Sequence, residues 1–397
     1  MNKRIYLDYN ATTPLSEEVR QFYIAELGSY ANGSSLHEDG RVAAKKITVA
    51  REQVSTLVNV KPEEIIFTSG GSESNNMVFN TMIEFSKKRG RNLIITTAIE
   101  HPCVLESSKR LASSFDMDVR YLPVDGDGMI KMDAYRAALA EKPLLVSIMT
   151  ANNEIGTVQD IKTLAAIAHK AGALFHTDAV QAAGKIPVDL FAWNVDYATF
   201  SAHKIYAPKG VGALCVKNGC PIEPFIRGGH QEHGLRAGTY NAPAIAAYGY
   251  AAELARKELP VYEAHTRTLR NRLRDGLLEF VPGVRINGHS VNVLPNTLDV
   301  SFPGAEGEAI LLHLDLLGVS VSTGSACASG SLEPSHVLMA TGLGPELAHG
   351  SIRFSFGKYN IESDVDFLLE HIPPVIARLR KMSSVSFCGM TDIGNLA

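Results

Sequence analysis

Short apolar runs alternate with longer amphipathic segments through the first 241 residues of this chain. The short runs indicate buried strands, and apolar residues that recur every three or four positions indicate helices. Because the strands have no polar face, the pattern predicts an α/β fold with a mostly parallel sheet flanked by helices on both sides. The predicted strands are residues 65–68, 92–97, 119–122, 144–149, 173–177, 197–200 and 213–216, and the predicted helices are 38–58, 72–86, 102–113, 132–140 and 161–171.

The pattern changes after residue 241. Two long helices, 242–258 and 262–280, are predicted on either side of Pro260, and strands and helices then follow in a less regular order that is typical of a smaller α+β unit. We expect three parts: a large domain of residues 14–258, a small domain of residues 1–13 and 259–382, and a tail of residues 383–397.

The composition is that of an ordinary globular protein, with 45% hydrophobic and 20% charged residues in 397. A net charge of −4 provides no attraction for nucleic acid or an anionic membrane, and no apolar run is long enough to cross a membrane. The sequence starts without a signal peptide, and its five cysteines are irregularly spaced, with no zinc-binding pattern. We therefore expect a cytoplasmic protein with free thiols and no metal.

Lys204 directly follows the predicted buried strand at residues 197–200, in the segment Ser-Ala-His-Lys. A lysine at that place is costly unless something pairs with it. An aldehyde cofactor removes the cost by binding the amine covalently, and pyridoxal 5′-phosphate (PLP) is the common one. On this segment alone, a solvated surface lysine is the better interpretation.

Polar residues directly follow the other predicted strands, at the carboxyl ends of these strands. Doubly wound sheets bind their ligands at the carboxyl ends of the strands. Gly71 and Ser72 begin a helix and suit an anion, or form an ordinary turn with a helix cap. Asp178 would be costly without a partner, and beneath a pyridine ring it would keep the ring nitrogen protonated. His101 and Asn153 also have structural alternatives, a hydrogen-bonded histidine and an Asx turn. Taken together with Gln181, these residues predict one crevice for PLP.

Several segments resemble the cysteine desulfurases of the NifS and IscS group, which are fold-type-I PLP enzymes. They are residues 6–14, 100–102, 152–156, 176–181, 201–204, 227–232, 236–239, 324–336 and 351–355. The resemblance covers nearly the whole chain in the family's order. The segment around Cys327 is the most specific one, and together with residues 227–232 it most resembles the nitrogen-fixation-type branch.

The resemblance implies an L-cysteine desulfurase in which a persulfide forms on Cys327. It also implies a homodimer and an iron–sulfur scaffold protein as the sulfur acceptor. The implied roles are Lys204 for covalent cofactor binding and Cα proton transfer, His101 for ring stacking and proton transfer, Asp178 and Gln181 for the ring nitrogen and phenolic oxygen, Gly71, Ser72, Ser201, His203 and the other subunit's Thr239 for the phosphate, and Asn153 and Arg353 for the substrate carboxylate.

Some features differ from the usual pattern or leave alternatives open. Asn32-Gly33 stands where Asn-Pro is common, and Ser72 replaces a frequent threonine but keeps the hydroxyl. The same scaffold supports selenocysteine lyases, other PLP-dependent lyases and aminotransferases, although an aminotransferase does not need Cys327. A sulfur carrier with a vestigial PLP site would be expected to lack Lys204 or Asp178. The small, polar composition of the Cys327 segment predicts a mobile loop.

Overall fold

The computed structural model describes residues 4–323 and 333–382. Its largest sheet has the strand order β2-β8-β7-β6-β5-β3-β4. The pairs β3–β4, β3–β5, β5–β6 and β6–β7 are parallel, and β8 runs antiparallel to both β2 and β7. This confirms the predicted α/β class. The strands are β2 (Ile65–Thr68), β3 (Leu93–Thr97), β4 (Asp118–Leu122), β5 (Leu145–Ser147), β6 (Leu174–Asp178), β7 (Tyr197–Ser201) and β8 (Gly212–Val216).

Alternate residues of these strands belong to two different hydrophobic cores. Ile65 and Phe67 pack in the core that includes buried residues of α2 (Glu38–Val58), α5 (Met132–Leu139), α6 (Ile161–Lys170) and α8 (Ala242–Phe280). Ile66 packs in the core formed with α3 (Gly71–Arg89) and α4 (Pro102–Phe115). Both faces of the sheet are therefore covered, as the unbroken apolar runs predict.

A four-stranded antiparallel sheet with the order β12-β13-β10-β9 has a separate hydrophobic core, which includes buried residues from the C-terminal part of α8. Beside it, β1 (Ile5–Tyr6) pairs in parallel with β11 (Val319–Ser320). The strands are β9 (Arg285–Asn287), β10 (Thr297–Ser301), β12 (Ser322–Thr323) and β13 (Ser351–Ser355), and the helices not yet named are α1 (Glu17–Glu26), α7 (Leu190–Trp193), α9 (Gly307–Leu316), α10 (His336–Ala340), α11 (Pro345–His349) and α12 (Glu362–Met382).

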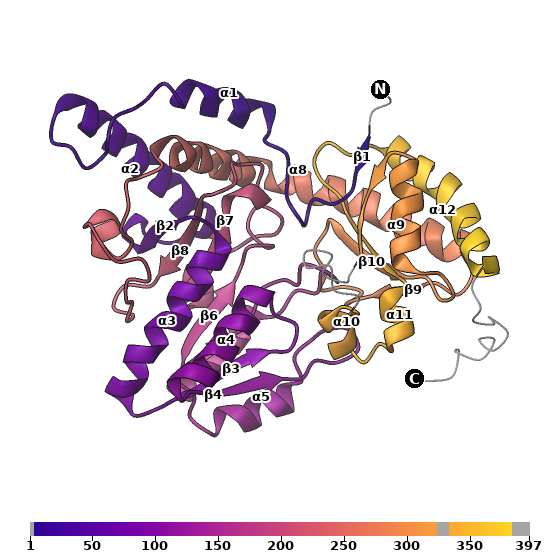
Figure 1. The fold of residues 1–397 in the computed structure, drawn as a ribbon, viewed down its shortest axis with the longest axis horizontal. Helices are drawn as coiled ribbons and strands as arrows, with labels where there is room; N and C mark the ends of the chain where they lie inside the picture. The colour runs from indigo at the N-terminus through magenta and orange to yellow at the C-terminus, as the bar shows by residue number, and fades with distance from the viewer. Residues whose placement is uncertain (1–3, 324–332, 383–397) are drawn as a thin grey trace.

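The expectation of two helices separated by Pro260 is wrong, because α8 runs unbroken from Ala242 to Phe280 with Pro260 inside it. A proline removes one hydrogen bond from a helix and crowds the preceding turn. Here the two ends of α8 are buried in different places: Ala247 lies in the core beside the large sheet, and Leu273 lies in the core of the smaller sheet. Burial at both ends outweighs the local defect. Figure 1 shows α8 reaching from one sheet to the other.

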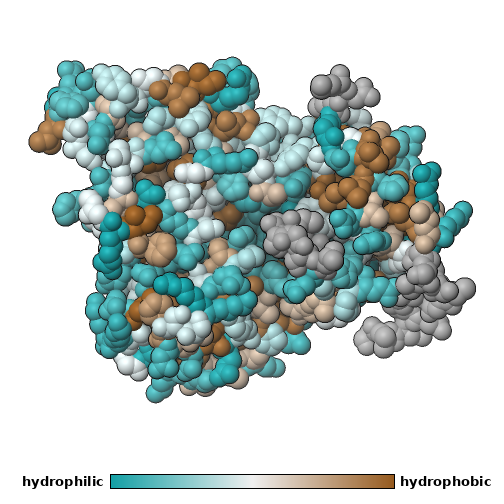
Figure 2. Space-filling view, in the orientation of Figure 1, coloured by the Kyte–Doolittle hydropathy of each residue, from teal (hydrophilic) through white to brown (hydrophobic). Residues whose placement is uncertain are grey.

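The division into residues 14–258, 1–13 with 259–382, and 383–397 stays a prediction, and its boundary between residues 258 and 259 falls inside α8. None of the described helices is both long and apolar enough to cross a membrane. On the face that Figure 2 shows, hydrophobic side chains form separate groups among polar ones.

A buried ion pair ties the edge of the large sheet to the loop before α8. The Arg51 guanidinium donates to both carboxylate oxygens of Glu232, over 2.7 and 2.6 Å, and Glu232 also accepts from the Phe67 amide at 2.9 Å. Glu232 is only 2% exposed. A few residues later, Arg236 binds Glu73 in the first turn of α3 at 2.9 Å. These contacts hold the loop against the end of α3.

We predict that Arg51→Met lowers the free energy of unfolding by about 3–5 kcal/mol, because it leaves the Glu232 carboxylate buried without its cation. Urea denaturation followed by circular dichroism measures the change. Arg20→Met is the matched control, because Arg20 and Glu17 form an exposed pair on α1, and it should alter stability very little. Equal effects in the two variants would contradict this role for the buried pair.

Candidate active site

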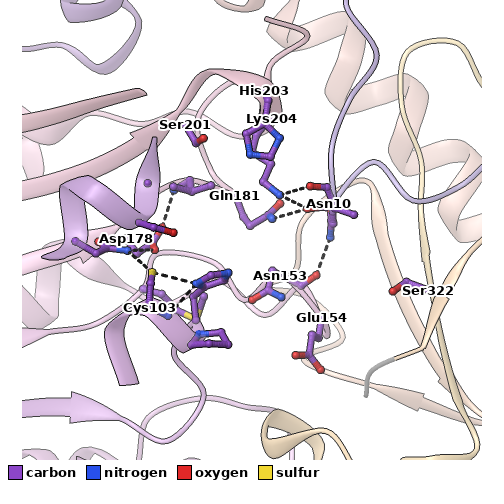
Figure 3. Close-up of a pocket in the computed structure, with 18 of the residues that line it drawn as sticks. Asn10, Cys103, Asn153, Glu154, Asp178, Gln181, Ser201, His203, Lys204 and Ser322 are labelled. Atoms are coloured by element: carbon purple, nitrogen blue, oxygen red, sulfur yellow. Dashed lines mark hydrogen bonds between the residues drawn. The ribbon is translucent and has the colours of Figure 1, made fainter. Parts of the chain in front are cut away.

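The predicted site residues gather in a pocket of about 510 Å³ at the carboxyl edge of the large sheet (Figure 3). The residues that line it are Asn10, Ala11, Gly71, Ser72, Asn75, His101, Pro102, Cys103, Met149, Asn153, Glu154, Asp178, Val180, Gln181, Ser201, His203, Lys204, Ser322, Thr323, His336 and Arg353. All predicted site residues are among them except Thr239 and Cys327. Thr239 is exposed in its loop, and Cys327 lies outside the described residues.

The start of α3 forms one wall of the pocket with glycine-rich backbone. Gly70, just before the helix, has φ 154° and ψ −177°, a conformation essentially restricted to glycine. A Cβ on Gly71 would lie 3.0 Å from Val180 Cγ2, so a side chain there would crowd the wall. The backbone can therefore come close to a ligand, with the amide groups of the first helical turn beside it. Ser72, Ser201 and His203 line the same pocket and offer hydrogen-bonding groups for a phosphate.

Asp178, at the end of β6, is a buried carboxylate held by neutral donors. The Val180 amide donates to its Oδ1 at 3.0 Å, and the Asn75 side-chain amide donates to its Oδ2 at 2.7 Å. Asp178 is 6% exposed and has no ion-pair partner within the described parts of the chain. A buried carboxylate is most stable beside a positive charge. The protonated nitrogen of a pyridine ring would provide that charge in this pocket.

His101 is the N-cap of α4, and this role determines which nitrogen carries the proton. Its Nδ1 accepts from the Cys103 amide at 3.2 Å. In the neutral ring the proton is therefore on Nε2. Burial lowers the pKa of His101, and the nearby charges of Lys204 and His336 lower it further, while Asp178 opposes them. His101 is thus a neutral imidazole that can donate through Nε2.

Lys204 ends the short 3₁₀ helix Ala202–Lys204 that follows β7. Its Nζ donates to the backbone oxygens of Asn10 at 2.5 Å and Ala11 at 2.6 Å (Figure 3). No carboxylate forms an ion pair with it among residues 4–323 and 333–382. Burial lowers its pKa to about 8, and the positive charge of Arg353 contributes to the shift. The solvated surface lysine considered above is therefore excluded.

Arg353, on β13, approaches the pocket from the smaller sheet. Its Nη2 binds Asp8 Oδ1 at 2.7 Å, and its Nη1 donates to the Asn153 backbone oxygen at 3.0 Å. These contacts fix the guanidinium plane and leave N–H groups for a carboxylate, which arginine binds through two parallel hydrogen bonds. The side chain of Asn153 lines the pocket beside it.

Several pocket residues received no role from sequence reasoning. Asn10 and His336 lie in segments that carried the resemblance, which was the only signal for them. Cys103, one of the expected free thiols, lines the pocket, and its Sγ lies 3.0 Å from His101 Nδ1. Burial raises its pKa to about 12, so it stays a thiol. Glu154 is half-buried beside Ser335, which donates to its Oε2 at 2.5 Å.

The comparisons with known proteins define the class. The aminotransferase class-V family matches residues 5–368, and the chain belongs to this family.

Individual relatives are more specific. A cysteine desulfurase of Gluconacetobacter diazotrophicus is 47% identical over 384 residues, which cover 96% of this chain and 95% of the relative. The cysteine desulfurase IscS of Clostridium botulinum is 44% identical over 389 residues, covering 96% and 97%. A solved NifS-like protein superposes with a TM-score of 0.88 at 41% identity, covering 94% of this chain and all of the other. The resemblance to the NifS and IscS group is confirmed.

We predict that the Lys204 amine of the cofactor-free protein becomes reactive near pH 8, because its lowered pKa leaves half of the amine neutral there. The measurement is the pH dependence of reductive methylation with formaldehyde, followed by peptide mapping. The reference is Nα-acetyl-lysine, whose amine has the ordinary pKa of about 10.4. A midpoint for Lys204 that equals the reference would contradict the burial argument.

Proposed function

We propose that this chain is a PLP-dependent cysteine desulfurase that converts L-cysteine to L-alanine and forms a persulfide on Cys327. The observation that carries the proposal is that one pocket holds both a lysine of lowered pKa, Lys204, and a buried carboxylate, Asp178, that has no ion-pair partner among residues 4–323 and 333–382. Enzymes of the matching family depend on PLP, and the relatives described above are named cysteine desulfurases. These names favour desulfuration over the selenocysteine lyase, other lyase and aminotransferase alternatives.

The pocket residues fit PLP group by group. The start of α3 at Gly71 and Ser72, together with Ser201 and His203, would bind the phosphate. Asp178 would pair with the ring nitrogen and Gln181 with the phenolic oxygen, while His101 would lie against the ring and Lys204 would hold the cofactor covalently. When bound, PLP supplies an electron sink for the charge that develops at the substrate's Cα.

The chain's own groups would then bind the substrate and move its protons. The Arg353 guanidinium and the Asn153 side chain hold the carboxylate of L-cysteine. Lys204 Nζ, with its pKa near 8, can take the Cα proton and return a proton later. His101 Nε2 is a donor placed to exchange a proton with the substrate.

The sulfur step uses Cys327. Its thiolate attacks the sulfur of the substrate, a new S–S bond forms, and the Cβ–S bond breaks with its electron pair going to the carbon side. Protonation of that carbon completes L-alanine, so cysteine plus enzyme thiol gives alanine plus enzyme persulfide. Ser322 and Thr323, shortly before Cys327, and His336 after it all line the pocket, which supports a place for this thiol beside the substrate.

The wider setting is part of the proposal. The protein works as a homodimer in which Thr239 of one copy joins the phosphate site of the other, because Thr239 does not line the pocket of its own chain. The persulfide sulfur passes to an iron–sulfur scaffold protein in the cytoplasm. We also propose that residues 14–258 bind the cofactor and that residues 1–13 with 259–382 carry the cysteine segment.

We predict that the purified protein with PLP, L-cysteine and dithiothreitol releases alanine and sulfide in equal amounts, and that Cys327→Ala abolishes sulfide release while it still binds PLP and L-cysteine. Amino-acid analysis, a colorimetric sulfide assay and the visible spectrum of the cofactor are the measurements. Cys220→Ala is the control, because Cys220 lies outside the pocket. Sulfide at the wild-type rate from Cys327→Ala would rule out the mechanism.

We further predict that Arg353→Lys raises KM for L-cysteine roughly 10- to 100-fold with a much smaller effect on kcat, because a lysine loses the two-bond contact with the carboxylate. Steady-state kinetics test this. Arg285→Lys is the control, since Arg285 is exposed on β9 of the same sheet. An unchanged KM in Arg353→Lys would mean that another group binds the carboxylate.

A further inference from the structure

A second lysine is buried behind the pocket, and the proposed mechanism does not use it. Lys185 is 1% exposed and is among the largest fully buried side chains of the described residues. It does not line the pocket. Its Nζ donates to Gln181 Oε1 at 2.5 Å and to Asn10 Oδ1 at 2.8 Å. Within the parts of the chain that the structure describes, no carboxylate forms an ion pair with it.

Burial without an anion favours the neutral amine. It lowers the pKa of Lys185 well below its ordinary value, and the positive charges of Lys204 and Arg353 act in the same direction. A neutral amine has two N–H donors, and the two amide oxygens of Gln181 and Asn10 use both of them. Lys185 is therefore satisfied as a donor without a counter-ion.

These contacts determine how the Gln181 amide is oriented. Lys185 presents its N–H groups to Gln181, so the oxygen end of the amide has to face it, since the opposite orientation would place donor against donor. The nitrogen end then faces away from Lys185, and Gln181 Nε2 donates to the Asn10 backbone oxygen at 3.0 Å. Figure 3 shows Gln181 beside Asn10 and Lys204 at the pocket.

The same lysine orients Asn10. Asn10 Oδ1 accepts from Lys185 and from Asn296 Nδ2, the latter at 3.1 Å, so its Nδ2 points the other way and donates to the Asn153 backbone oxygen at 3.1 Å. The backbone oxygen of Asn10 is one of the two acceptors of Lys204 Nζ, together with that of Ala11. The Lys185 amine thus fixes the orientation of two side-chain amides, those of Gln181 and Asn10, and both of these residues line the pocket.

We propose that Lys185 is a positioning residue: its two hydrogen bonds hold the Gln181 amide with Nε2 toward the pocket, where it donates to the phenolic oxygen of the cofactor, and hold Asn10 as the acceptor for Lys204. This role rests on the proposed function, because it assumes PLP in the pocket. Lys185 touches neither the cofactor nor the substrate, so it acts through Gln181 and Asn10.

The test compares visible spectra of the holoenzyme over a range of pH. A hydrogen-bond donor to the phenolic oxygen withdraws electron density from the conjugated system of the cofactor. It thereby lowers the pKa of the nitrogen atom that links Lys204 to the cofactor. Lys185→Met has a similar volume but no donor, so it should raise the midpoint pH of the visible absorbance change by about one unit, the size expected for one lost hydrogen bond to a charged group. It should also weaken PLP binding to the cofactor-free protein about 10-fold, measured by fluorescence titration.

Two further variants separate positioning from general stability. Gln181→Leu should raise the midpoint as much as Lys185→Met, and the double variant should show no additional rise, because both changes remove the same hydrogen bond. Lys185→Gln keeps a neutral N–H donor and should return the midpoint toward that of the wild type. If Lys185→Met does not fold, Lys185→Leu replaces it in the comparison with Lys185→Gln.

The outcomes distinguish this inference from the proposed function. A wild-type protein that binds no PLP would overturn both. If the wild type binds PLP and releases alanine, three results would overturn the role of Lys185 alone. They are an unchanged midpoint pH in Lys185→Met, a double variant whose rise equals the sum of the two single rises, and equal midpoints in Lys185→Met and Lys185→Gln. A lower melting temperature with an unchanged midpoint would assign Lys185 to the stability of the fold alone.

Discussion

The pocket depends on the hydrogen bonds of one buried residue, Asn10. Its backbone oxygen accepts from Lys204 and Gln181 on the side of the large sheet. On the other side, its side-chain amide donates to Thr297 Oγ1 at 2.8 Å, and its backbone amide donates to Ser355 Oγ at 3.0 Å. Both of these partners belong to the smaller sheet. Since each of these groups would be costly to bury unpaired, the two sheets have to meet where Asn10 satisfies them together.

The electrostatics follow from this close approach. The positive charge of Arg353 helps to lower the pKa of Lys204, and the charges of Lys204 and Arg353 help to lower the pKa of Lys185. Asp8 and Asp178 act against that effect on Lys204. The balance leaves Arg353 paired with Asp8 and leaves the Lys204 amine close to its titration point at neutral pH. A site with this charge distribution favours an anionic ligand that also accepts an amine, which is the chemistry of PLP with an amino acid.

The sequence predicted the large sheet and most of the pocket for a physical reason. Unbroken apolar runs indicate strands buried on both faces, and the carboxyl ends of parallel strands converge, so Asp178 and Lys204 could be assigned to one crevice. Asn10 and Lys185 could not be assigned in this way. Their partners are far away in the sequence, and no local rule indicates that an amide would satisfy a lysine 175 positions later. The continuity of α8 was missed for a similar reason, because the local effect of Pro260 is visible in the sequence and the two distant cores are not.

The helix α8 has a mechanical consequence for the pocket. It is one continuous helix whose N-terminal part is buried in the core of the large sheet and whose C-terminal part is buried in the core of the smaller sheet. If the distance between the two sheets changes, the width of the crevice between them changes as well, and α8 has to bend. Pro260 lies between the anchored ends and lacks the amide that would complete the hydrogen-bond ladder, so bending there meets less resistance than elsewhere along the helix. The turn at Pro260 is therefore where α8 bends most easily when the two sheets change their spacing.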